Sequence, residues 1–155
     1  AMFDREYERL LDDADAARLA ADSYEGMEYV YGLLENGADA DALVGGDDVA
    51  YHGHCQQRTL DLVGYTEAVL RRVGHDVITS DVECCGMAGS FGYKSEYYEL
   101  SMDVGADLHE QFAGDDGRGA DRRVAASGAS CHEQLLALAF EGVPHPIELV
   151  APRRR

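Results

Sequence analysis

The stretch Asp48-Val49-Ala50-Tyr51-His52-Gly53-His54-Cys55 (DVAYHGHC) joins a short apolar run to a cysteine through a His-Gly-His sequence. The apolar run predicts a buried strand at residues 49–51. Leucines and valines at helical spacing then predict a helix over residues 57–73, which Gly74 ends. Cys55 is therefore expected between the carboxyl end of a strand and the start of a helix.

The same order of strand, cysteine-bearing turn and helix occurs twice more along the chain. Residues 76–79 form an expected strand before Cys84 and Cys85, and residues 123–126 form another before Cys131. Repeated strand–helix units are typical of α/β proteins with a parallel sheet. We therefore expect a Rossmann-like three-layer unit with a small, mainly parallel sheet of three or four strands.

The first part of the chain carries a helical pattern without strands. Apolar residues at helical spacing predict one helix over residues 6–21, with Leu10 on its apolar stripe, and another over residues 23–35. We expect residues 1–47 to be an N-terminal helical segment that packs on the sheet. Residues 48–152 then form the cysteine-rich domain.

The charge of the chain is strongly negative, with 30 acidic against 13 basic residues and a formal net charge of -17. Lys94 is the only lysine among the basic residues. Such a surface repels itself at low salt, and we interpret it as adaptation to a salty cytoplasm, so the protein is predicted to be halophilic. The acidic surface also argues against nucleic acid as a partner, because phosphate binding needs a basic face.

The distribution of charged and apolar residues bears on location. Charges are scattered through the first twenty residues, and no apolar run approaches the ~18 residues of a membrane span. We expect no transmembrane segment and a cytoplasmic location, with contact to the inner face of the membrane only through partners. In a reducing compartment, four cysteines are more often thiols or metal ligands than disulfides.

All the cysteines of the chain follow predicted strands; they are Cys55, Cys84, Cys85 and Cys131. The carboxyl ends of parallel strands share one edge of a sheet, so we expect the four sulfurs to meet there. Thiolates at one place repel one another unless a cation lies among them, and four sulfurs suit zinc or an iron–sulfur cluster. The glycines that begin at Gly86 let the backbone wrap closely and direct N–H groups at the sulfurs.

Other roles stay open from the residues alone. Buried cysteines also act as small apolar side chains, and a zinc-binding or metal-free module that docks a partner carries no redox chemistry. Cys84 and Cys85 would suit a thiol–disulfide reductase, since a disulfide between neighbours is strained and easily reduced. His52 and His54 are candidates to donate a hydrogen bond to a cluster sulfur, to be a fourth metal ligand, or to bond the loop backbone.

Specific motifs carry a resemblance to a known family. YHGHC at residues 51–55, CCGMAGSFGY at residues 84–93, ASGASCHEQ at residues 126–134 and HPIEL at residues 145–149 resemble the cysteine-rich domain named for its CCG motif. The family includes a heterodisulfide reductase subunit and the iron–sulfur subunits of glycolate oxidase and anaerobic glycerol-3-phosphate dehydrogenase. It also includes the C-terminal parts of FAD-linked D-lactate-type dehydrogenases, which the motifs resemble most. The resemblance covers roughly residues 48–150.

The resemblance implies that the four cysteines hold an iron–sulfur cluster, a single [4Fe–4S] cluster in the first place, with zinc as the alternative. It implies an electron-transfer part of an FAD-linked oxidoreductase that acts on a 2-hydroxy acid or glycerol 3-phosphate, without catalytic residues of its own. The FAD would lie on a flavin-containing partner, either another domain or another subunit. A quinone or another electron carrier would take the electrons onward.

The sequence departs from the family at one position. The full family pattern ends in C-x2-C and has five cysteines, which can hold a non-cubane pair of fused clusters. Here Gly128 stands where the first cysteine of that pair would be. The departure calls into question both the five-cysteine cluster and the disulfide-cleaving chemistry tied to it.

Overall fold

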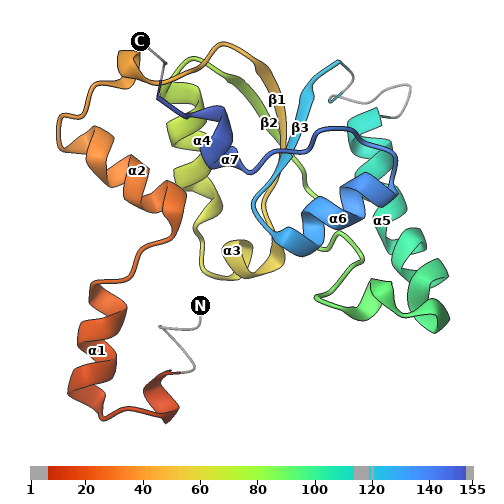
Figure 1. Ribbon diagram of the computed structural model, residues 1–155, viewed down its shortest axis with the longest axis horizontal. Helices are drawn as coiled ribbons and strands as arrows, with labels where there is room; N and C mark the ends of the chain where they lie inside the picture. Colours follow the sequence, from red (N-terminus) through yellow and green to blue (C-terminus); the bar gives the residue numbers. More distant parts are fainter. Residues whose placement is uncertain (1–6, 114–118, 120, 153–155) are drawn as a thin grey trace.

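The computed structural model has a three-stranded parallel sheet at its centre (Figure 1). β1 (Asp48–His52) lies between β2 (Asp76–Thr79) and β3 (Arg123–Ala126), so the strand order is β2-β1-β3. The predicted strands at residues 76–79 and 123–126 are found at those residues. The α/β, Rossmann-like fold class is confirmed.

Helices cover both faces of the sheet in the part of the chain that the structure describes, which is residues 7–113, 119 and 121–152 (Figure 1). α2, α4 and α7 lie on one face, and α5 and α6 lie on the other. Within the described ranges, no helix has the length and apolar character needed to cross a membrane. The helices are α1 (Asp13–Ala21), α2 (Gly26–Glu35), α3 (Cys55–Thr59), α4 (Val63–Arg72), α5 (Tyr98–Ala113), α6 (Ala129–Ala137) and α7 (Pro146–Leu149).

The alternation of side chains along β1 sets up two separate cores. Val49 and Tyr51 pack with α2, α4 and α7, whereas Ala50 packs with α5 and α6. All three side chains are fully buried, as expected for the central strand of a parallel sheet covered on both faces. Because successive side chains point to opposite faces, His52 lies on the Ala50 face. The core on that face also contains Cys85 and Cys131.

The N-terminal helix differs from its prediction. Residues 6–21 do not form one helix: a short 3-10 turn at Tyr7–Arg9 precedes α1, and Asp12 caps α1 by accepting a hydrogen bond from the Asp15 N–H at 3.0 Å. A carboxylate with this local bond favours a helix start over a helix interior. Leu10 was predicted to pack and is instead 76% exposed. α1 projects away from the sheet, so only α2 fulfils the expectation of helices packed on it (Figure 1).

The helix predicted over residues 57–73 is two helices, α3 and α4. Its start moves forward to Cys55, because the Nδ1 atom of His54 caps α3 by accepting hydrogen bonds from two backbone N–H groups. The two helices are separated at Asp61, whose φ of 57° is left-handed and incompatible with a continuous helix. The early start matters for the site, since it places Cys55 in the first turn of a helix directly after β1.

Candidate metal centre

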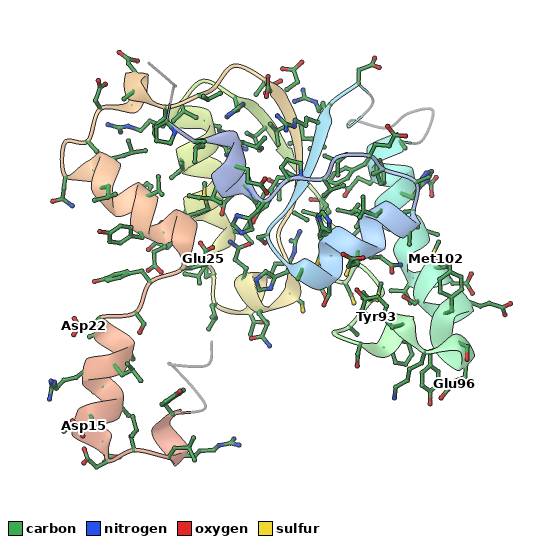
Figure 2. The ribbon with its side chains drawn as sticks, in the orientation of Figure 1. Asp15, Asp22, Glu25, Tyr93, Glu96 and Met102 are labelled. Carbon is green, nitrogen blue, oxygen red and sulfur yellow. The ribbon has the colours of Figure 1, made fainter. Side chains whose placement is uncertain are left out.

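Three buried side chains meet where the parallel strands end (Figure 2 draws the side chains on the ribbon). His52 ends β1, Cys85 lies in the loop after β2, and Cys131 lies in the first turns of α6 after β3. A ring nitrogen of His52 and the two Sγ atoms all lie within 4.8 Å of one another. One imidazole and two thiols at this spacing can hold a metal ion.

The other two cysteines lie on the open side of this group. Cys55 and Cys84 are exposed, and neither belongs to the group of three within the described residues. Negative charge on either of them raises the pKa of Cys131, so both act on the buried pair electrostatically. All four cysteines are free thiols. The four predicted ligands are therefore split into an inner pair, Cys85 and Cys131, and a rim pair, Cys55 and Cys84.

The glycine-rich loop directs its backbone N–H groups at the sulfurs, as predicted. The N–H of Gly86 donates to the Sγ of Cys84 at 3.4 Å, and the N–H of Met87 donates to the sulfur of Cys85. Gly86 has a φ of +96°, and a Cβ there would collide with the carbonyl oxygen of Ser101 on α5. Only glycine permits this backbone conformation together with this close approach.

The inner pair shares one proton in the metal-free chain. A hydrogen bond from the Cys131 thiol is the largest of the effects that lower the pKa of Cys85, from 9.0 to about 4. The same hydrogen bond, followed by burial, raises the pKa of Cys131. One of the two buried sulfurs is therefore already a thiolate, the form that binds metal.

His52 is held from one side only. Its Nδ1 atom lies 2.7 Å from the Oγ of Ser80, the residue that follows β2. Its Nε2 atom is buried and has no hydrogen-bond partner among the described residues. A buried polar atom without a partner is costly in a folded protein, so its presence beside two thiols is a sign of a functional site.

Comparisons with known proteins agree with this sulfur-rich site. The chain is 34% identical over 104 residues to one subunit of the anaerobic glycerol-3-phosphate dehydrogenase of Escherichia coli (strain K12), which is 66% of this chain and 25% of that subunit. It is 29% identical over 110 residues to the D-2-hydroxyglutarate dehydrogenase of the same organism, which is 69% of this chain and 10% of that protein. The predicted resemblance to the cysteine-rich CCG family is confirmed. The chain spans only a quarter and a tenth of the length of these relatives, and no family model and no solved structure matches it.

The second histidine of the CCG-family motif YHGHC has a different task from the first. The Nδ1 atom of His54 accepts from the N–H groups of Gln56 and Gln57 at 3.1 and 3.3 Å, and the backbone N–H of His54 donates to Ser127 Oγ at 3.2 Å. Burial lowers the pKa of His54, in agreement with a neutral ring that accepts at Nδ1. His54 thus ties the β1–α3 turn to the end of β3, while His52 faces the sulfurs.

The position at which this chain departs from the CCG family lies directly beside the site. Gly128 is the residue before α6, and a Cβ there would lie 3.4 Å from the Sγ of Cys131 and 2.9 Å from the Cβ of His54. A cysteine at this position would therefore point into the site, as the family pattern implies. In this chain the space is closed by the packing of His54.

Two surface cavities flank the CCG loop and the β1–α3 turn. A cavity of about 400 Å³ is lined by Cys55, Arg58, Thr59, Asp81 and Glu83, so one rim sulfur opens onto a partly acidic depression. A larger cavity of about 680 Å³ has no cysteine among its described lining residues and lies between the end of α1 and α3. Access to the sulfurs is therefore from the rim side.

Two residues of the site were not predicted from the sequence, Arg58 and Ser80. Arg58 Nη2 donates to the carbonyl oxygen and to the Oγ of Ser80 at 2.6 and 3.0 Å, and Arg58 Nε donates to the carbonyl oxygen of Gly53 at 3.0 Å. Ser80 follows a predicted strand, so its place at the sheet edge could have been read from the sequence. Its contact with His52 depends on packing and could not.

Proposed function

We propose that this chain is the iron–sulfur electron-transfer part of an FAD-linked oxidoreductase that acts on a 2-hydroxy acid or glycerol 3-phosphate. The observation that carries the proposal is the meeting of His52, Cys85 and Cys131 at the carboxyl edge of the sheet. Relatives named as glycerol-3-phosphate and D-2-hydroxyglutarate dehydrogenases support the class of parent reaction. Their much greater length supports a division of labour among domains or subunits.

The residues at the sheet edge fit an iron–sulfur cluster in three respects. The sulfurs of Cys55, Cys84, Cys85 and Cys131 are soft ligands, the kind that such clusters require. One inner sulfur is a thiolate before any metal binds, because Cys131 donates its hydrogen bond to Cys85. Backbone N–H groups from the loop stabilise negative charge on the sulfurs. A bound [4Fe–4S] cluster would supply the one-electron chemistry.

The chain's own residues would bind, orient and shield this cluster. The inner pair lies in the core beneath α5 and α6, where water is excluded. The rim pair faces solvent, on the side from which a partner can approach. We place the FAD and the substrate on a flavin-containing partner, and a quinone or another carrier beyond it. The 155-residue chain alone is therefore expected not to oxidise lactate or glycerol 3-phosphate.

Metal analysis after anaerobic purification in high salt tests the proposal. We expect about four irons and four acid-labile sulfides per chain, with an EPR signal that changes on addition of dithionite. The Cys84→Ser variant should lose that signal. A chain without iron under these conditions would contradict the proposal.

Zinc is the second candidate, because one imidazole nitrogen and two sulfurs are a common zinc ligand set. Zinc has no redox chemistry, so the chain would then be a structural or docking module of the parent enzyme. One zinc and no iron per chain in the same experiment would establish this alternative.

A further inference from the structure

The imidazole of His52 has two faces with different environments. Nδ1 lies 2.7 Å from Ser80 Oγ, while Nε2 is without a partner among the described residues and faces the group that contains Cys85 and Cys131. A neutral imidazole carries its hydrogen on one nitrogen only, so the bond at Nδ1 decides what Nε2 can do. A hydrogen on Nε2 would make it a donor to sulfur, and a lone pair would make it a metal ligand.

The Ser80 hydroxyl settles this choice through its own partners. Arg58 Nη2 donates to Ser80 Oγ at 3.0 Å, and a guanidinium has no acceptor atoms. The hydroxyl hydrogen therefore cannot be used toward Arg58. Ser80 is buried, and its hydroxyl makes no further hydrogen bond among the described residues beyond those to Arg58 and His52.

The hydroxyl hydrogen must therefore point at Nδ1 of His52. If Nδ1 carried the hydrogen instead, the hydroxyl of Ser80 would be left as an unsatisfied buried donor. Arg58 is itself fixed by two further bonds, to the carbonyl oxygens of Gly53 and Ser80, so its position does not depend on His52. The three side chains form a directed relay from guanidinium to hydroxyl to imidazole.

We infer that Ser80, fixed by Arg58, holds His52 with its hydrogen on Nε2, so that His52 donates to the cysteine sulfurs and is not a metal ligand. Ser80 and Arg58 are thus positioning residues for the centre. This role deepens the proposed function and rests on it where a cluster is concerned. Hydrogen bonds to cluster sulfurs favour the reduced, more negative state and so raise the reduction potential.

The test is the tautomer of His52 in the full, reduced, metal-free chain, read by long-range ¹H–¹⁵N NMR on histidine-labelled protein at about pH 8, above the ordinary histidine pKa. His52→Gln assigns the signal among the six histidines. The wild type should show the hydrogen on Nε2. Ser80→Ala should shift the population toward Nδ1–H, and Ser80→Thr, which keeps the hydroxyl, should restore it.

Thr79→Val is the matched control, because it removes a hydroxyl from the neighbouring residue that bonds to Glu67 and not to His52. Arg58→Lys, which cannot make all three bonds, should shift the tautomer in the same direction as Ser80→Ala and serves if that variant does not fold. Hydrogen on Nδ1 in the wild type, or an unchanged tautomer in both variants, would overturn the inference.

The inference and the proposed function can fail separately. The tautomer is read without metal, so a chain that takes up no iron contradicts the function and leaves the relay intact. If iron loads, the midpoint potential should fall in Ser80→Ala and stay unchanged in Thr79→Val. An unchanged potential in Ser80→Ala would overturn the donation to sulfur.

Discussion

The inner and rim halves of the centre differ in how much of the site the fold itself prepares. Cys85 and Cys131 are 4% exposed, hydrogen-bonded to each other and packed in the core of the α5–α6 face. Cys55 and Cys84 are exposed, one in the first turn of α3 and the other held by a loop N–H. The inner half is preorganised by packing, whereas the rim half is positioned by local backbone alone. The inner half should therefore control metal affinity, and the rim half should control exchange with the outside.

Gly86→Ala breaks the inner half most severely. The substitution combines a φ of +96° with a collision against the Ser101 carbonyl oxygen, so the loop must leave α5. We expect a loss of about 3 kcal/mol in the free energy of unfolding, measured by urea denaturation. Gly89→Ala is the matched control, since its φ is +71° but nothing lies within 4 Å of the added Cβ. It should cost about 1 kcal/mol; equal losses would show that the close approach to α5 is unimportant.

Serine substitutions compare the two halves directly. Cys85→Ser removes the buried thiolate and leaves Cys131 without its hydrogen-bond acceptor, so the chain should lose most of its metal. Cys55→Ser affects an exposed ligand that water can replace, so the chain should retain metal but release it faster to a chelator. Metal per chain and the release rate after addition of EDTA check both outcomes. Greater metal loss in Cys55→Ser than in Cys85→Ser would reverse the assignment of the two halves.

The pH dependence of stability separates the halves in the metal-free chain. Between about pH 4 and the ordinary thiol value of 9.0, the folded inner pair holds one proton and the unfolded pair holds two, so stability rises with pH. Above 9.0 the unfolded pair holds none while the folded pair keeps one, so stability falls. Urea unfolding with reductant should thus show a maximum near the ordinary thiol pKa.

The control for this maximum is a comparison of variants, because other groups titrate over the same range. Replacing both inner cysteines with serine should remove the difference, and replacing Cys55 with serine should leave the profile of the wild type. A maximum that persists without the inner pair would mean that the shared proton is not its origin.

Salt should have the smallest effect on the contrast between the halves. A chain with 30 acidic and 13 basic residues repels itself, so its melting temperature should rise from low to molar KCl. The rise should be equal in Cys55→Ser and Cys85→Ser, since it arises from the whole surface. A melting temperature that does not rise with salt would contradict the halophilic prediction, which rests on composition alone.

The sheet and the gathering of cysteines could be predicted from sequence because both follow from strand order. Residues 76–79 and 123–126 were predicted as strands from short apolar runs, and parallel strands bring their carboxyl ends to one edge. The division into inner and rim cysteines could not be predicted, because burial depends on how α5 and α6 pack. The breaks at Asp12 and Asp61 were missed for a related reason. A single side-chain cap or a single left-handed residue outweighs an apolar pattern that continues across it.

The roles of the two histidines also lay beyond the sequence pattern. His52 and His54 stand two residues apart on either side of a glycine, and the pattern gives them equal claims to the sulfurs. The structure separates them, because His52 still belongs to the strand and follows its alternation, while His54 begins a helix. The assignment of the four cysteines as ligands remains a prediction, as does the division of the chain at residue 48.

The packing of Gly128 against His54 bears on how this chain can change over evolutionary time. A fifth cysteine at residue 128 requires its Cβ within 2.9 Å of the Cβ of His54, an atom that no side-chain rotation can move. The residue that caps α3 therefore blocks a single-step return to the five-cysteine pattern. A lineage would have to change residue 54 first and lose the cap before a cysteine at 128 gave any advantage. Such ordered dependence makes the reduced ligand set a one-way step rather than a reversible variation.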